Sequence, residues 1–166
     1  MIFQRKEAVH LASFVQMFQL SSKVRERKTE SAICEAGIEK PTESGKSFYL
    51  RKYLEVELKK VKNSYLENLL TNTYDCEIKV EGKEPNLFLC QCCNYITLEK
   101  RGEYFICPVC FWEDDGISSV NQFSSANKMT LGEGRYNFEL LGAIKEDFLK
   151  FLYEDRMLRY DRKIDY

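Results

Sequence analysis

Apolar residues recur every three or four positions through much of the first half of the chain, which is the spacing of one helix face. Residues 4–20 and 23–36 are predicted to form two such helices, the second ended by Gly37. The most regular stripe lies within residues 47–71 and predicts one long helix. Its members are Leu50, Leu54, Leu58, Val61, Tyr65 and Leu69. Residues 1–73 are therefore expected to form a mainly helical region.

In the second half of the chain the apolar segments become short. Apolar and polar residues alternate over 76–80, which predicts a half-exposed strand. Three short apolar runs at 87–89, 95–98 and 104–106 predict further strands. A turn around Gly102 is expected to join the last two into a hairpin.

Two helices are predicted after this β region. Thr130 and Glu133 form a capping-box sequence, which opens a helix that Gly142 is expected to end. Helical spacing over 144–158 predicts a last helix. The charged end of the chain is expected to fray. Its apolar side chains are then available to a partner: Tyr160, Ile164 and Tyr166.

Four of the seven cysteines form two C-x2-C pairs separated by thirteen residues, Cys90 with Cys93 and Cys107 with Cys110. Each pair is predicted to lie on a tight turn, and the hairpin between the turns brings both to the same end. Four thiolates in this arrangement can bind one Zn2+ tetrahedrally. The predicted fold class is therefore α+β, with residues 74–166 forming a zinc ribbon followed by helices.

This zinc site is expected to be structural. Four cysteine ligands leave no coordination position for water or substrate, whereas catalytic zinc keeps one open. The single histidine, His10, lies about 80 positions away in the sequence. A redox dithiol or an iron site is the alternative for these cysteines. Cys92, inside the first turn, is an alternative metal ligand, a spare oxidisable thiol or a small core residue.

Composition indicates an ordinary globular protein, with 44% hydrophobic and 31% charged residues. The chain carries 25 basic and 26 acidic side chains, so it lacks the basic excess that favours nucleic-acid binding. No apolar stretch approaches the roughly 20 residues of a membrane span. The start of the chain has no signal-peptide pattern. Metal-bound and free thiols in a reducing cytoplasm are therefore expected.

The first cysteine turn, residues 90–98, and the run Ile106–Gly116 resemble the bacterial cysteine-rich CPCC family. Residues 130–138 and Gly142-Ala143 also resemble its C-terminal helix, so the likeness extends over about residues 87–143. The resemblance implies metal-binding cysteines and no assigned reaction. It leaves the first eighty residues without a counterpart.

The chain departs from the family pattern at three positions. Gln91 stands where the family has Pro, and Asn94 stands where it has Gly. Asn tolerates the left-handed conformation that such a turn often needs, so the metal turn can be kept. Gly134 replaces a usual Ala in the helix.

The resemblance also implies a biological context, because small bacterial proteins of this kind often accompany secreted toxins as immunity proteins. We expect a non-enzymatic protein that binds and neutralises a toxin, with a basic toxin domain as the expected partner. The acidic and aromatic residues after the second turn would complement such a surface: Trp112, Glu113, Asp114 and Asp115. The alternative is that these acids solvate a turn while Trp112 packs against the zinc site.

Two other functions are weaker expectations. A nucleic-acid or transcription accessory would need basic residues around the ribbon, and only Lys100 and Arg101 are near. An enzyme or redox sensor would use Cys92, but the sequence offers no paired base other than the distant His10.

Overall fold

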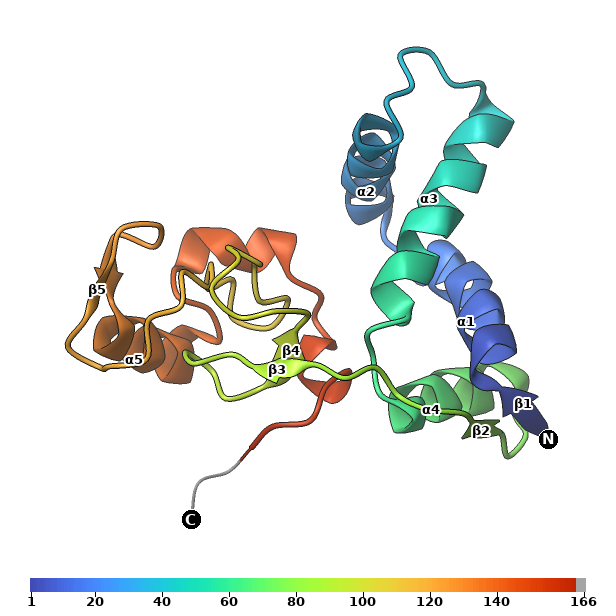
Figure 1. Ribbon diagram of the computed structural model, residues 1–166. Helices are drawn as coiled ribbons and strands as arrows, with labels where there is room; N and C mark the ends of the chain where they lie inside the picture. The colour runs from blue at the N-terminus through green and yellow to red at the C-terminus, as the bar shows by residue number, and fades with distance from the viewer. Residues whose placement is uncertain (164–166) are drawn as a thin grey trace. The chain divides into compact units, whose positions relative to one another are not determined.

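Figure 1 shows a computed structural model of the chain, which describes residues 1–163. It contains helices together with short strands, which confirms the α+β class. The chain divides into two compact units, unit 1 (residues 1–85) and unit 2 (residues 86–166). Within the described residues, no helix has the length and apolar character needed to cross a membrane.

Unit 1 is built from helices that enclose an aliphatic core. Its elements are β1 (Ile2–Gln4), α1 (Arg5–Gln19), α2 (Ser22–Glu35), α3 (Glu43–Leu58), α4 (Asn63–Tyr74) and β2 (Lys79–Glu81). Helix α1 packs against α3 and α4, and α2 packs against α3. The predicted helices over 4–20 and 23–36 are confirmed by α1 and α2. The small side chains of Ala8 and Ala12 on α1 are fully buried, which lets the helices approach closely.

The single helix predicted over residues 47–71 is wrong, because the chain forms two helices with a break after Leu58. Lys62, which precedes α4, is extended, with φ −72° and ψ 156°. Val61 and Tyr65 stay buried on either side of this residue. The apolar periodicity therefore continues across the break and does not reveal it.

Arg5 supplies a partner for the backbone at this break. Its guanidinium donates to the carbonyl of Lys59 at 2.9 Å and to the carbonyl of Val61 at 2.6 Å. Carbonyls at a helix end have no intrahelical donor, so an arginine from another helix satisfies them. The first residue of α1 thus fixes the turn between α3 and α4.

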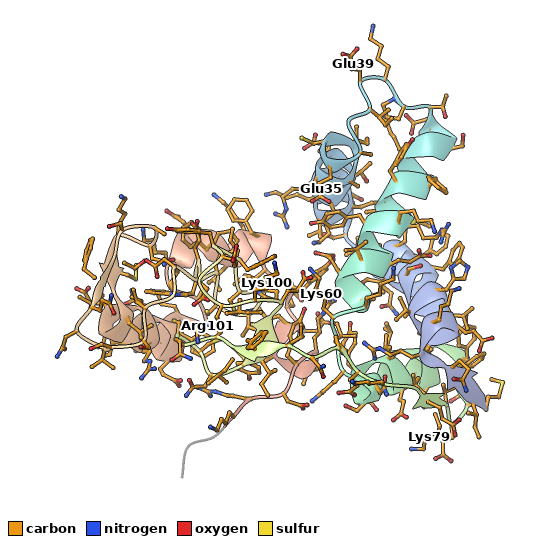
Figure 2. All side chains as sticks on the ribbon, in the orientation of Figure 1. Glu35, Glu39, Lys60, Lys79, Lys100 and Arg101 are labelled. Atoms are coloured by element: carbon orange, nitrogen blue, oxygen red, sulfur yellow. The ribbon has the colours of Figure 1, made fainter. Side chains whose placement is uncertain are left out.

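Strands β1 and β2 pair in parallel at one end of unit 1. Ile2 lies opposite Lys79, which is labelled in Figure 2, and Phe3 lies opposite Val80. The sequence predicted a strand in this region but not its partner at the start of the chain. Because β2 pairs with β1, the residues before Pro85 belong with the helices, and the unit boundary lies further along the chain than residue 73.

Glu55 on α3 is a buried carboxylate surrounded by basic side chains. His10 on α1 lies 2.8 Å from its Oε1, Lys52 donates to Oε2 at 3.0 Å, and Arg51 also donates to Oε1. Burial opposes the ionisation of Glu55, but the hydrogen bonds from Lys52 and His10 and the charge of Arg51 outweigh it. The pKa of Glu55 is therefore lowered.

A lowered pKa means that Glu55 stabilises unit 1 above the pKa of an unfolded glutamate, about 4.3, and loses this effect as pH falls through its folded pKa. We expect Glu55→Gln to destabilise the chain by about 1.5–3 kcal/mol at neutral pH, since charge-assisted hydrogen bonds are lost. Urea unfolding followed by helical circular dichroism would measure this. The difference from wild type should shrink at acidic pH. Glu43→Gln, at an exposed carboxylate, is the control, and an equal effect of both variants would contradict the assignment.

Unit 2 has short strands, one α-helix and two 3-10 turns in its described part. These elements are β3 (Phe88–Leu89), β4 (Ile96–Leu98), β5 (Phe123–Ser124), β6 (Met129–Thr130), α5 (Leu131–Leu141), η1 (Glu146–Phe151) and η2 (Arg156–Leu158). Thr130 and Glu133 form the predicted capping box, and Gly142 ends α5 in the left-handed conformation with φ 76°. The prediction for α5 is confirmed.

The predicted hairpin and the predicted last helix of unit 2 are wrong. No hairpin joins residues 95–98 to 104–106; instead β4 pairs antiparallel with β3 across the first cysteine turn. The helix expected over 144–158 is replaced by η1 and η2. In this segment the N–H groups of Phe148, Leu152 and Leu158 bond to carbonyls three residues earlier, which is the pattern of a 3-10 helix.

Candidate metal centre

Four cysteine sulfurs converge in the interior of unit 2. The Sγ atoms of Cys90 and Cys110 are 3.7 Å apart, and those of Cys93 and Cys107 are 3.6 Å apart. All four lie within 4.8 Å of one another. A tetrahedral zinc with Zn–S bonds of about 2.3 Å separates its sulfurs by about 3.8 Å. The arrangement therefore fits one Zn2+ bound by the four predicted cysteines.

The first cysteine turn is closed by its own backbone. The Asn94 N–H donates to the carbonyl of Cys90 at 3.0 Å, and the Cys90 N–H donates to the carbonyl of Tyr95 at 2.9 Å. Asn94 has φ +62°, in the left-handed region. Asparagine adopts this conformation more easily than most residues. Asn94 can therefore stand where the family pattern has glycine.

The second turn repeats the same pair of bonds. The Phe111 N–H donates to the carbonyl of Cys107 at 2.9 Å, and the Cys107 N–H donates to the carbonyl of Trp112 at 2.8 Å. Phe111 is also left-handed, with φ +69°, which is costly for a bulky side chain. The centroid of its ring lies 4.5 Å from the ring centroid of Phe148 and 5.6 Å from that of Phe151. This stacking offsets the cost and holds the turn.

Residues 88–157 match the model of the family described as cysteine-rich CPCC. The match confirms the resemblance indicated by the cysteine turns, and it covers most of unit 2 and none of unit 1. No curated protein and no solved structure matches the chain. Residues 88–157 are therefore the CPCC region of the chain.

The thiols of the CPCC region need a cation to ionise together. Burial raises the pKa of Cys93 and of Cys110, and both lie well above the usual value for a thiol. Burial also opposes ionisation of Cys107, but hydrogen bonds from Cys110, Cys90 and neighbouring groups outweigh it and lower its pKa. Ionisation of all four thiols together is favoured when a divalent cation compensates their negative charge.

Two donors outside the ligand set support Cys107. The hydroxyl of Thr97 on β4 lies 3.2 Å from its sulfur, and the Val109 N–H donates to it at 3.4 Å. Thr97 is 4% exposed, so this contact lies in the interior. Donors to a metal-bound thiolate reduce its charge and fix its orientation.

Cys92 lies outside the group of four sulfurs. It is buried, and its sulfur is 3.5 Å from the position that a Cβ on Gly134 would occupy. Such a Cβ would also lie 2.7 Å from Cζ3 of Trp112. The structure therefore places Cys92 in the core against α5. It also accounts for Gly134, since a larger residue there would force the Trp112 ring to move.

The acidic segment after the second turn is largely internal. Trp112 and Asp114 are fully buried, and Glu113 and Asp115 are partly exposed. Asp114 accepts hydrogen bonds from Arg101 Nε at 2.8 Å and from the Gly102 N–H at 2.6 Å. Only Glu113 and Asp115 of the predicted partner-binding set are thus available at the surface.

Asp115 and Glu113 also take part in local structure. The Ser124 hydroxyl donates to Asp115 at 2.7 Å. The Asn127 side chain accepts from the Glu113 N–H at 2.9 Å and donates to the Glu113 carbonyl at 2.8 Å. These bonds tie the segment after the second cysteine turn to the β5–β6 hairpin. The backbone of this acidic segment therefore helps to position the second turn.

Three arginines bind the backbone of the cysteine turns, and sequence reasoning missed them. Nε of Arg135 donates to the carbonyl of Gln91 at 2.9 Å, and Nε of Arg156 donates to that of Val109 at 3.0 Å. Nε of Arg162 lies 3.2 Å from the carbonyl of Cys93. Zinc with four thiolates carries a net charge of about −2. The three cations lie where they offset that charge and hold the turns.

The segment that carries Arg162 pairs with the first turn. The Ile96 N–H donates to the carbonyl of Asp161 at 2.9 Å, and the Lys163 N–H donates to the carbonyl of Asn94 at 2.8 Å. Tyr160 is buried. The expectation of a frayed end is therefore wrong for residues 159–163. The predicted contacts of Ile164 and Tyr166 lie outside the described residues.

We expect Cys110→Ser to abolish stoichiometric zinc binding and to unfold the CPCC region. Zinc binding by such sites supplies about 10–16 kcal/mol, which a domain with strands this short cannot replace. Metal analysis by mass spectrometry and the near-ultraviolet signal of Trp112 would report the change. Unit 1 should keep its helical signal because its core contains no metal ligand.

The matched control is Cys92→Ser, which should keep one zinc per chain. Full zinc content in Cys110→Ser, or its loss in Cys92→Ser alone, would contradict the assignment of the four ligands.

We expect Arg156→Ala to release zinc to a chromogenic chelator about tenfold faster than wild type, since outer-shell partners of metal ligands typically contribute at that scale. Its guanidinium also donates to the carbonyls of Tyr153 and Gly142, so the second turn loses its support on one side. Lys100→Ala, at an exposed cation of the same unit, is the control. Equal release rates in both variants would show that Arg156 does not stabilise the site.

Proposed function

We propose that the chain is a non-enzymatic zinc-binding protein that acts by binding another protein. The observation that carries this proposal is the closed metal centre. Four buried cysteines complete a tetrahedral zinc, so no coordination position is left for a substrate or a reactive water. The ion then serves to fold unit 2 and to present its surface.

The partner we propose is a toxin that this chain neutralises in the cytoplasm of a bacterium. The proposal rests on the CPCC resemblance and the immunity context that it implies. Unit 2 carries 10 basic and 13 acidic residues, a net charge of −3. A basic toxin domain would be attracted to such a surface.

The binding surface we propose is the aromatic group Phe111, Phe148 and Phe151. Phe151 is 42% exposed, and Phe111 and Phe148 are half-buried beside it. The ammonium groups of Lys145 and Lys150 lie over the Phe148 and Phe151 rings, so the attraction of a basic domain rests on the net charge of unit 2 and not on this group. Aromatic side chains that are already ordered lose little entropy on binding and are frequent at the centres of interfaces. Because Phe111 directly follows a zinc ligand, the metal fixes the position of this surface.

A nucleic-acid accessory remains the alternative, with Lys100 and Arg101 as its candidate contacts (Figure 2). Arg101 supports it weakly, because its guanidinium pairs with the buried Asp114. An enzymatic role for Cys92 has less support still. Its thiol lies in the core, and the chain's single histidine belongs to unit 1.

A pull-down from the native host, with the tagged and zinc-loaded protein as bait, tests the proposed function. We expect one stoichiometric protein partner that is encoded near this chain. Cells that express this chain should be protected against the toxicity of that partner. Phe151→Asp should weaken capture about tenfold or more, since a charge in an aromatic contact is strongly unfavourable. Zinc content is measured on the same sample, and Phe151→Leu, which keeps an apolar contact to Phe111 beside the second turn, should keep one zinc per chain.

Leu140→Asp is the matched control, because Leu140 is an exposed apolar residue on α5. Recovery of nucleic acid or polymerase in place of a protein partner would overturn the proposal in favour of the accessory role. Equal capture by both variants would exclude the aromatic surface.

A further inference from the structure

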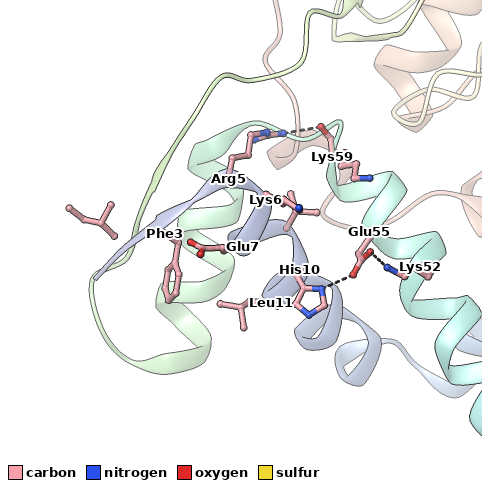
Figure 3. A pocket seen from close by; sticks show the side chains of 11 residues that line it. Phe3, Arg5, Lys6, Glu7, His10, Leu11, Lys52, Glu55 and Lys59 are labelled. Carbon is pink, nitrogen blue, oxygen red and sulfur yellow. Dashed lines mark hydrogen bonds and ion pairs between the residues drawn. The ribbon is translucent and has the colours of Figure 1, made fainter.

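Unit 1 contains a surface hollow between β1, α1 and α3, with a volume of about 1070 Å³. Figure 3 shows that its lining is divided. Phe3 and Leu11 lie toward one end, with the Glu7 carboxylate near them, and Lys59 and Lys52 lie toward the other. The hollow therefore offers an apolar area and a cationic area side by side.

The charges of the lining do not balance. Four cations line the hollow against two carboxylates, Glu7 and Glu55. Glu55 is occupied by the cations around it, and Glu7 accepts from the Gln4 N–H at 3.0 Å. Within the described residues, no acidic group pairs with the ammonium of Lys6 or that of Lys59. Two positive charges thus remain free for an anionic ligand.

The hollow is shallow rather than enclosed. Ile2 is 66% exposed, and the side chains of His10 and Lys52 are 53% and 51% exposed. Pockets that hold small molecules tightly bury about 70–90% of the ligand surface, which this lining cannot do. A segment of a larger partner, held by other contacts as well, fits such a surface better.

The scaffold of the hollow is already ordered. Arg5 fixes the start of α1 to the break after α3 through its bonds to the Lys59 and Val61 carbonyls. Glu55 joins α1 to α3 through His10, as the dashed lines in Figure 3 show. A preformed cationic surface binds with less loss of entropy than one that must be assembled.

We propose that this hollow binds an acidic segment of a partner protein in which apolar residues stand beside the carboxylates. The apolar residues would cover Phe3 and Leu11, and the carboxylates would pair with Lys6 and Lys59. This inference rests on the proposed function in one respect, namely that the chain acts by binding a protein. It assigns to unit 1 a contact separate from the aromatic surface of unit 2.

The test uses a synthetic peptide of two leucines followed by three glutamates, titrated into the full zinc-loaded chain and followed by two-dimensional NMR. We expect shifts in the amides of β1 and the first turns of α1, and weaker binding as salt is raised. The same peptide with lysines in place of glutamates should not bind. Lys6→Glu combined with Lys59→Glu should weaken binding about tenfold or more, since two ion pairs are replaced by repulsions.

The control combines Lys23→Glu with Lys40→Glu, which changes the net charge equally at two exposed lysines that do not line the hollow. Equal loss of binding in both double variants would mean a general charge effect and would overturn the proposal, as would binding of the lysine peptide.

The outcome of the peptide titration is separate from that of the pull-down. Selective peptide binding without a native partner would support the hollow and not the proposed function. If a native partner binds the double variant Lys6→Glu and Lys59→Glu as well as it binds wild type, the proposed role of the hollow is excluded. The proposed function of the chain is not affected by that result.

Discussion

The attraction between four buried thiolates and one divalent cation is the interaction on which unit 2 depends. Its strands are two or three residues long, too short to hold one another without further support. The two cysteine turns are separated by thirteen residues and do not share a strand pair. A metal bound by the four sulfurs would therefore link the two turns, and the aromatic, acidic and arginine contacts lie around that site.

Compensation of charge explains much of the remaining architecture of unit 2. A zinc tetrathiolate in the interior is a buried dianion, which is costly unless donors surround it. Thr97 and Val109 donate directly to a sulfur, and arginines from α5, η2 and the following segment approach the turns through their carbonyls. Segments that are distant in sequence are thus drawn to one place by the same electrostatic requirement.

The features that depend on local chemistry were predictable from the sequence. The cysteine spacing predicted the four ligands that the structure brings together, and the capping-box residues predicted the start of α5. Features that depend on distant partners were not. The apolar periodicity continues across the break after α3 and so does not reveal it. The carbonyls at the break accept hydrogen bonds from Arg5, which lies on another helix. The burial of Trp112 likewise depends on Gly134, twenty-two positions away, which a pattern of neighbouring residues does not reveal.

The pairing of residues 159–163 with the first cysteine turn has a consequence for the order of assembly. During synthesis the four cysteines leave the ribosome before this segment does. The hydrogen bonds from the Ile96 and Lys163 N–H groups that join this segment to the first turn can therefore form only after all four cysteines of the metal site have been synthesised.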